Sequence, residues 1–147
     1  HKKDSAVALP FDRWCDMTDI LERLHVTDRG ILEAHYMRGF NYIHGGIVDD
    51  GWENPIVKDG TRRVFSRMDT EIVLGHPKLS PKRKRFYLEQ MGIAGRRVPV
   101  WPRVKYFASE TRFFVKSNGV RGLLRKVGGF ANGKAVAARR AKENAKG

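Results

Sequence analysis

The chain has 147 residues, a formal net charge of +13, 41% apolar side chains and one cysteine, Cys15. This length allows one compact domain with a tail, but not two full domains. A single cysteine excludes an intramolecular disulfide and a zinc site built from paired thiolates. No apolar run approaches the roughly eighteen residues of a membrane helix, and we see no secretory signal.

The charge is divided between the two halves of the chain. Residues 1–60 contain 7 Lys/Arg and 11 Asp/Glu, a net charge of −4, whereas residues 61–147 contain 22 and 5, a net charge of +17. This division predicts one face for protein and one for a polyanion. The first residue, His1, fits removal of a mitochondrial presequence, or a sequence that starts after the natural N-terminus. We expect a protein of the mitochondrial matrix.

Residues 12–39 predict a pair of helices with an acidic character. An apolar stripe at i, i+3, i+4 and i+7 marks the first helix. Thr27 is a candidate N-cap for the second helix, and Gly39 a candidate end. A helix-turn-helix that reads DNA is disfavoured because the local charge is acidic. The stripes are Met17, Ile20, Leu21 and Leu24, then Ile31, Leu32, His35 and Tyr36.

Residues 40–75 contain many turn residues, and we expect a hairpin at Asp59-Gly60 between residues 56–58 and 61–65. Residues 71–74 fit a strand or a helical turn. Ser80 followed by Pro81 predicts the N-terminus of a helix that runs to about Met91 and ends at Gly92.

The last third of the chain predicts a short antiparallel sheet. Residues 103–108 and 111–116 alternate basic with apolar or aromatic side chains, Asn118-Gly119 predicts a hairpin turn, and residues 120–127 could form a third strand. We therefore predict an α+β fold: one domain over residues 1–127, with its acidic helical part at 12–39 and its basic part at 78–127. Residues 128–147 form a basic C-terminal extension, in which 134–144 could be helical.

The basic surface is the best candidate site. Lys/Arg residues neutralise nucleic-acid phosphates and release counterions, and aromatic side chains on basic strands can stack on unpaired bases. We predict RNA binding by Lys82, Arg83, Lys84, Arg85, Arg96, Arg97, Arg103, Lys105, Arg112, Lys116, Arg121, Arg125, Lys126, Lys134, Arg139, Arg140 and Lys142.

Catalytic signals are weak. The segment 44–46, His-Gly-Gly, has some likeness to an oxyanion-hole loop, but no G-x-S-x-G turn accompanies it. Asp49, Asp50 and Glu53 could gather a divalent cation in a nuclease, although Asp is common in turns for backbone reasons. His35 on an apolar stripe fits a packing residue. We expect no catalytic residue, no metal and no cofactor.

Two resemblances follow from these residues. Residues 78–147 resemble organellar ribosomal proteins in general character, with a small α+β body, a basic run at 81–85 and a basic Gly/Ala tail. This resemblance implies a non-catalytic structural subunit of a mitochondrial ribosome. It would bind ribosomal RNA through its basic half and neighbouring proteins through its N-terminal helices.

The second resemblance is local. Residues 39–41, Gly-Phe-Asn, the acidic pair 49–50, residues 53–59 and Arg62-Arg63-Val64 are similar to the small matrix-facing, ubiquinone-binding-type subunit of mitochondrial complex III. It implies an accessory subunit that packs against membrane-protein loops, with basic residues meeting anionic lipid. The helix expected after residue 64 is interrupted by His76-Pro77 and Ser80-Pro81. An RNA-processing enzyme and a free nucleic-acid-binding module remain as alternatives.

Overall fold

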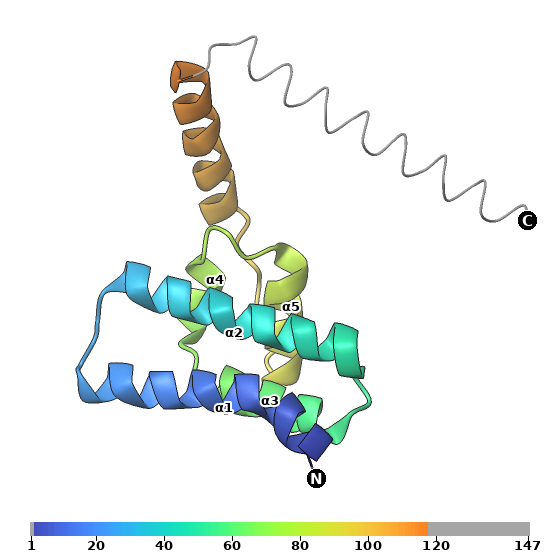
Figure 1. Ribbon diagram of the computed structural model, residues 1–147. Coiled ribbons are helices and arrows are strands. Elements are labelled where there is room, and N and C mark those ends of the chain that lie inside the picture. The colour runs from blue at the N-terminus through green and yellow to red at the C-terminus, as the bar shows by residue number, and fades with distance from the viewer. Residues whose placement is uncertain (1, 118–147) are drawn as a thin grey trace, which may run out of the picture. The chain divides into compact units, whose positions relative to one another are not determined.

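The computed structural model describes residues 2–117, and this part of the chain is helical without a strand (Figure 1). It forms two compact units, one up to Arg103 and one from Val104 onward. Within the first unit, α1 and α2 lie side by side and antiparallel, α3 packs on both, α4 packs on α2, and α5 packs on α3. The helices are α1 (Lys2–Arg23), α2 (Arg29–Asp50), α3 (Pro55–Ser66), α4 (Thr70–Gly75), α5 (Pro81–Gln90) and one over residues 101–117.

Short polar side chains set where these helices begin. The Asp28 carboxylate accepts a hydrogen bond from the Ile31 amide at 2.9 Å, so Asp28, not the expected Thr27, is the N-cap of α2. Asn54 and Asp69 cap α3 and α4 in the same way. Ser80 caps α5, as expected for Ser before Pro. Each cap satisfies a backbone amide that has no partner inside its helix.

The core is built from aromatic rings contributed by four helices. Phe11 of α1, Phe40 of α2, Phe65 of α3 and Tyr87 of α5 are all buried. The Phe65 ring centroid lies 5.0 Å from that of Phe40 and 5.1 Å from that of Tyr87. Aromatic pairs at these distances and tilts add roughly 0.5–1.5 kcal/mol beyond their buried area. This cluster therefore joins the segments of the first unit.

Two glycines allow α1 to approach the other helices closely. A Cβ atom on Gly60 of α3 would lie 2.5 Å from the Phe11 ring, and one on Gly39 of α2 would lie 2.9 Å from Nε1 of Trp14. Only a residue without a side chain leaves room for these rings. Helix α1 thus depends on hydrogen atoms at positions 39 and 60 for its close packing.

The predicted α+β fold is wrong, because the residues expected in strands lie in helices. The supposed hairpin at 59–60 is inside α3, which begins at the Asn54 cap and buries Val57, Gly60, Thr61 and Val64 on one side. These positions have the i, i+3, i+4, i+7 spacing of a helix face. Residues 71–74 belong to α4.

Residues 103–108 and 111–116 were also expected to be strands, and both lie in the helix over residues 101–117. The proline at 102, in the first turn, suits a helix start because its missing amide has no intrahelical partner there. The turn at 118–119, the third strand at 120–127 and the helix at 134–144 fall outside the described residues. In the described part, no helix combines the length and the apolar content needed to cross a bilayer.

The two predicted N-terminal helices are confirmed, but each is longer than the range 12–39 implied, and α2 continues past Gly39, its expected end, to Asp50. The buried face of α1 also differs from the expected stripe. Phe11, Trp14 and Thr18 are buried, whereas Ile20 and Leu24 are 42% and 69% exposed. On α2, the expected His35 and Tyr36 are buried. The exposed stripe of α1 is therefore available to a neighbouring molecule.

The glycine contacts give a stability prediction. Gly60→Ala should lower the free energy of unfolding by about 1–3 kcal/mol, because the new methyl group would overlap the Phe11 ring. Gly45→Ala is the matched control: it also lies inside a helix, but nothing lies within 4 Å of its Cβ position. This control should raise stability by roughly 0.5–1 kcal/mol. Urea unfolding followed by circular dichroism measures both, and equal effects would contradict the proposed packing.

Candidate functional site

The basic run at the start of α5 is divided between surface and core. Lys82 and Arg85 are exposed, whereas Lys84 is only 1% exposed. The Arg83 guanidinium donates a hydrogen bond to Oδ1 of Asn41 in α2 at 3.0 Å. Successive helical residues point about 100° apart, so four adjacent cations cannot share one face. Lys82 and Arg85 therefore remain the outward-facing cations of this run.

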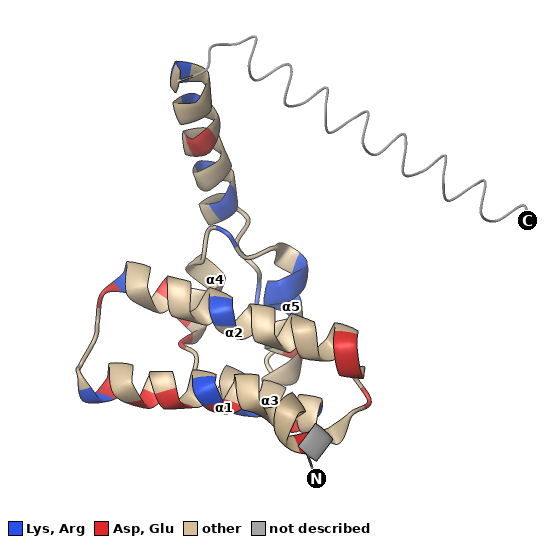
Figure 2. Ribbon diagram, in the orientation of Figure 1, with Lys and Arg blue, Asp and Glu red and all other residues tan. Residues whose placement is uncertain are grey.

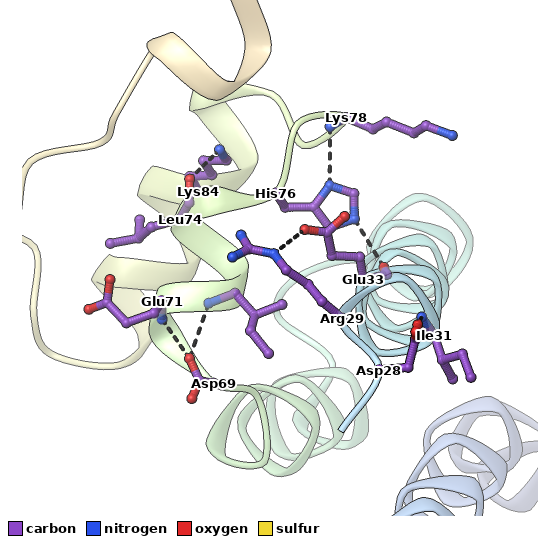
Figure 3. Close-up of polar contacts among 11 residues, drawn as sticks. Asp28, Arg29, Ile31, Glu33, Asp69, Glu71, Leu74, His76, Lys78 and Lys84 are labelled. Carbon is purple, nitrogen blue, oxygen red and sulfur yellow. Dashed lines mark hydrogen bonds and ion pairs between the residues drawn. The ribbon is translucent and has the colours of Figure 1, made fainter. Parts of the chain in front are cut away.

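Lys84 connects α5 to α4. Its Nζ donates a hydrogen bond to the carbonyl of Leu74 in the last turn of α4 at 2.5 Å, as Figure 3 shows. The negative end of the helix dipole favours a cation at this position. Burial lowers the pKa of Lys84, and the nearby charge of Arg103 lowers it further. The structure therefore gives Lys84 an internal contact and removes it from the candidate RNA surface.

The other predicted cations are spread over several places. Arg96 forms an ion pair with Glu71, and Arg97 is exposed. Lys105, Arg112 and Lys116 are exposed on the helix over residues 101–117, where Figure 2 shows blue segments along its length. Arg103, in the first turn of that helix, is partly buried. The remaining predicted RNA contacts lie outside the described residues: Arg121, Arg125, Lys126, Lys134, Arg139, Arg140 and Lys142.

Several acidic side chains of the N-terminal half bind basic residues of the same chain. Asp12 of α1 lies 2.9 Å from Nη1 of Arg63 in α3. Asp19 and Glu22 of α1 both bind Nη2 of Arg67, the residue that ends α3, at 2.6 and 2.8 Å. Partly exposed pairs of this kind contribute up to about 1 kcal/mol each. Part of the acidic character of α1 therefore serves the contact between α1 and α3.

An apolar surface lies where α1 and α2 meet near their connecting loop. We call it the hairpin patch and define it as Met17, Ile20, Leu24 and Ile31, which are 40%, 42%, 69% and 49% exposed. Met17 and Ile20 line a hollow of about 320 Å³ together with His35 and Arg38 of α2. Contiguous exposed apolar side chains with polar neighbours are typical of protein-docking surfaces.

A second hollow lies between α2 and the start of α5. Its volume is about 500 Å³, and apolar side chains of both helices form most of its wall. Lys82 and Arg83 lie at the same hollow. It is lined by Phe40, Ile43, His44, Ile47, Val48, Ser80, Lys82, Arg83 and Phe86.

The two buried histidines, His35 and His76, form hydrogen bonds inside the fold. The His35 ring stacks on Trp14 with centroids 4.4 Å apart, and its Nε2 lies 2.8 Å from Oγ1 of Thr18. Because the Thr18 hydroxyl donates to the Trp14 carbonyl at 2.9 Å, Nε2 of His35 must carry the proton. His35 is thus the packing residue that the sequence indicated. Burial lowers its pKa to about 4, with further lowering by Arg38 and Arg67.

His76 uses both ring nitrogens. Its Nδ1 accepts a hydrogen bond from the Lys78 amide at 3.1 Å, so its Nε2 donates to the Glu33 carbonyl at 3.0 Å (Figure 3). This arrangement requires the neutral ring, and burial lowers the pKa of His76. The ring connects the turn after α4 to α2.

The candidate metal residues do not form a metal site in residues 2–117, where no group of three or more His, Cys, Asp or Glu side chains is close enough to hold an ion. Asp49 and Asp50 lie at the end of α2, and Glu53 follows in the loop. The Glu53 carboxylate instead binds Lys58 at 2.8 Å. His44, Gly45 and Gly46 lie within α2 and form no loop.

Comparisons with protein-family models, characterised proteins and solved structures found no match.

The buried histidines predict a loss of stability in acid. The pKa of His35 is about 4 in the folded chain against 6.5 for an exposed ring, so the unfolded chain takes up a proton first. The contribution of His35 to the free energy of unfolding should be fully present above about pH 6.5. It should fall by roughly 1–3 kcal/mol between pH 6.5 and 4.

His35→Gln keeps a hydrogen-bonding group at this position and removes the titration. Its free energy of unfolding should therefore change less than that of the natural chain over this pH range. Urea unfolding at several pH values makes the measurement, with exposed His44→Gln as the control for loss of one imidazole. Parallel curves for His35→Gln and the natural chain would exclude His35 as the titrating group.

Proposed function

We propose that this chain is a non-catalytic, matrix-side accessory subunit of mitochondrial respiratory complex III. One observation carries the proposal: several of the residues on which this resemblance rests lie where α1, α2 and α3 meet. Gly39 lies against Trp14, and Val57 and Val64 are fully buried in α3. Arg63 binds Asp12 and Asp59. The resemblance thus covers positions on which the helical packing depends.

The interruption noted after residue 64 has a local explanation. Helix α3 continues to Ser66, and α4 ends at Gly75, next to His76. His76 then holds the turn by its bonds to Glu33 and Lys78, and α5 begins at Pro81. The two prolines therefore lie at a helix junction, and the segments on either side remain packed together in one unit.

The hairpin patch supplies a surface for such a subunit. An accessory subunit needs exposed apolar side chains that become buried in the assembly, with charged residues around them. Ile20, Leu24 and Ile31 meet this need, and Asp16, Arg23 and Asp28 lie near them in the chain. In this proposal the hairpin patch contacts a protein neighbour in the mitochondrial matrix.

Leu24→Asp combined with Ile31→Asp should disrupt the association, because each change places a charge at a surface that must lose its water. A tagged chain should comigrate with the cytochromes of complex III in detergent after nuclease treatment, and the double variant should not. Leu9→Asp is the control: Leu9 is 44% exposed on α1, about 22 Å along the helix from Leu24. A natural chain that never comigrates with cytochromes would refute the proposal.

A structural subunit of a mitochondrial ribosome is the second candidate, and the net charge of +17 over residues 61–147 favours it. The helical fold removes part of its basis, because the small α+β body and the basic–aromatic strands are absent from residues 2–117. The exposed cations Lys82 and Arg85 remain available to phosphates. Under this candidate the basic half would bind ribosomal RNA and hold the chain on the particle.

Neutralising Lys82 and Arg85 together tests the ribosomal candidate. Lys82→Gln with Arg85→Gln should weaken RNA binding and reduce the slope of log affinity against log salt by roughly 2. Lys84 stays unchanged because it is buried, and exposed Arg62→Gln serves as the control. Sedimentation of the natural chain with a particle that RNase dissolves would support the ribosome. An unchanged salt slope would exclude this part of α5 as an RNA contact.

A further inference from the structure

The helix over residues 101–117 carries a continuous apolar side. Six of its residues, five of them apolar and one a threonine, recur at i, i+3, i+4, i+7, i+10 and i+11, the spacing that places side chains on a single helix face. We call this the apolar face. It consists of Val104, Phe107, Ala108, Thr111, Phe114 and Val115.

Solvent reaches this face mainly in its first half, since Phe114 and Val115 are partly buried. Val104 is 47% exposed and Phe107 is 51% exposed, and Trp101, at the edge of the face in the first turn, is 64% exposed. Large apolar side chains that share an exposed face indicate an interaction surface. The face covers 12 positions of a regular helix, from Val104 to Val115, so it is about 17 Å long.

Cations lie along both borders of the apolar face. At 100° per residue, Lys105, Arg112 and Lys116 fall on one side of it and Arg103 on the other. Glu110, the one acidic residue of this helix, falls on the same side as Arg103, so four cations accompany one carboxylate along residues 101–117. Long basic side chains beside an apolar face can extend past it to reach negatively charged groups.

We propose that the helix over residues 101–117 binds the surface of an anionic lipid bilayer. The apolar face would enter the boundary between headgroups and acyl chains, and the flanking Lys and Arg would reach lipid phosphates. RNA would use the same cations but would leave Val104 and Phe107 in water. A bilayer surface accounts for both the charge and the exposed apolar side chains.

The full chain can be tested with phosphatidylcholine vesicles that contain or lack phosphatidylglycerol. The natural chain should cosediment with the anionic vesicles and much less with the neutral ones. Val104→Ser with Phe107→Ser should weaken binding about tenfold, because both side chains would lose their place in the apolar layer. Phe113→Ser is the matched control, since Phe113 is 72% exposed but lies on the opposite side of the helix. It should bind as the natural chain does.

Arg112→Gln with Lys116→Gln should weaken binding to anionic vesicles by roughly thirtyfold, since each cation near such a surface contributes about 1 kcal/mol. Circular dichroism should show that all variants retain their helix content. Equal binding by the Val104/Phe107 and Phe113 variants would overturn the proposal, because attraction would then be due to charge alone. The proposal would also be overturned if Val104→Ser with Phe107→Ser weakened RNA binding and left vesicle binding unchanged. Vesicle binding uses the isolated chain, so its failure would leave comigration with complex III unaffected.

Discussion

The packing of Phe11 between helices is the constraint on which the first unit depends. The ring is 1% exposed and lies against α3 where Gly60 leaves room for it. It also approaches Gly46 of α2, where a Cβ would lie 3.1 Å from the tip of the ring. One side chain of α1 thus sets the distances to two other helices. The ring cluster of Phe40, Phe65 and Tyr87 continues the same core toward α5.

Charge has two separate roles in this chain. Arg63, Arg67, Lys84 and Arg96 bind carboxylates or a carbonyl of the same unit and hold helices together. Other cations, such as Lys82 on α5, are exposed. Net charge alone does not distinguish these roles, because a buried lysine and an exposed one count equally. The net charge therefore overstates how many cations of the first unit are exposed and able to bind a polyanion.

Sequence patterns predicted the elements that carry a local signal. Ser80-Pro81 located the start of α5 because a capping side chain and a fixed φ act within one turn. Asp59-Gly60 wrongly predicted a hairpin turn. Gly60 is needed because the Phe11 ring, 49 positions earlier, packs against it, and a local pattern carries no sign of that contact. The burial of Lys84 likewise depends on the Leu74 carbonyl, which no property of the basic run reveals. In residues 103–116, alternating cations suggested strands, although the helical spacing of Val104, Phe107 and Phe114 was present as well.

The bond between Lys84 and Leu74 has a consequence for how the chain acquires its structure. Helix α4 has six residues, fewer than a helix needs to persist alone in water. Its last carbonyls have no partner inside the helix, and the Lys84 ammonium satisfies one of them from the next helix. During synthesis, α4 can pack on α2 once it has emerged, but its Leu74 carbonyl waits for its lysine partner until residues 81–90 follow. A chain that ends before residue 84 would keep the packing of α4 on α2 and lose this bond from α5.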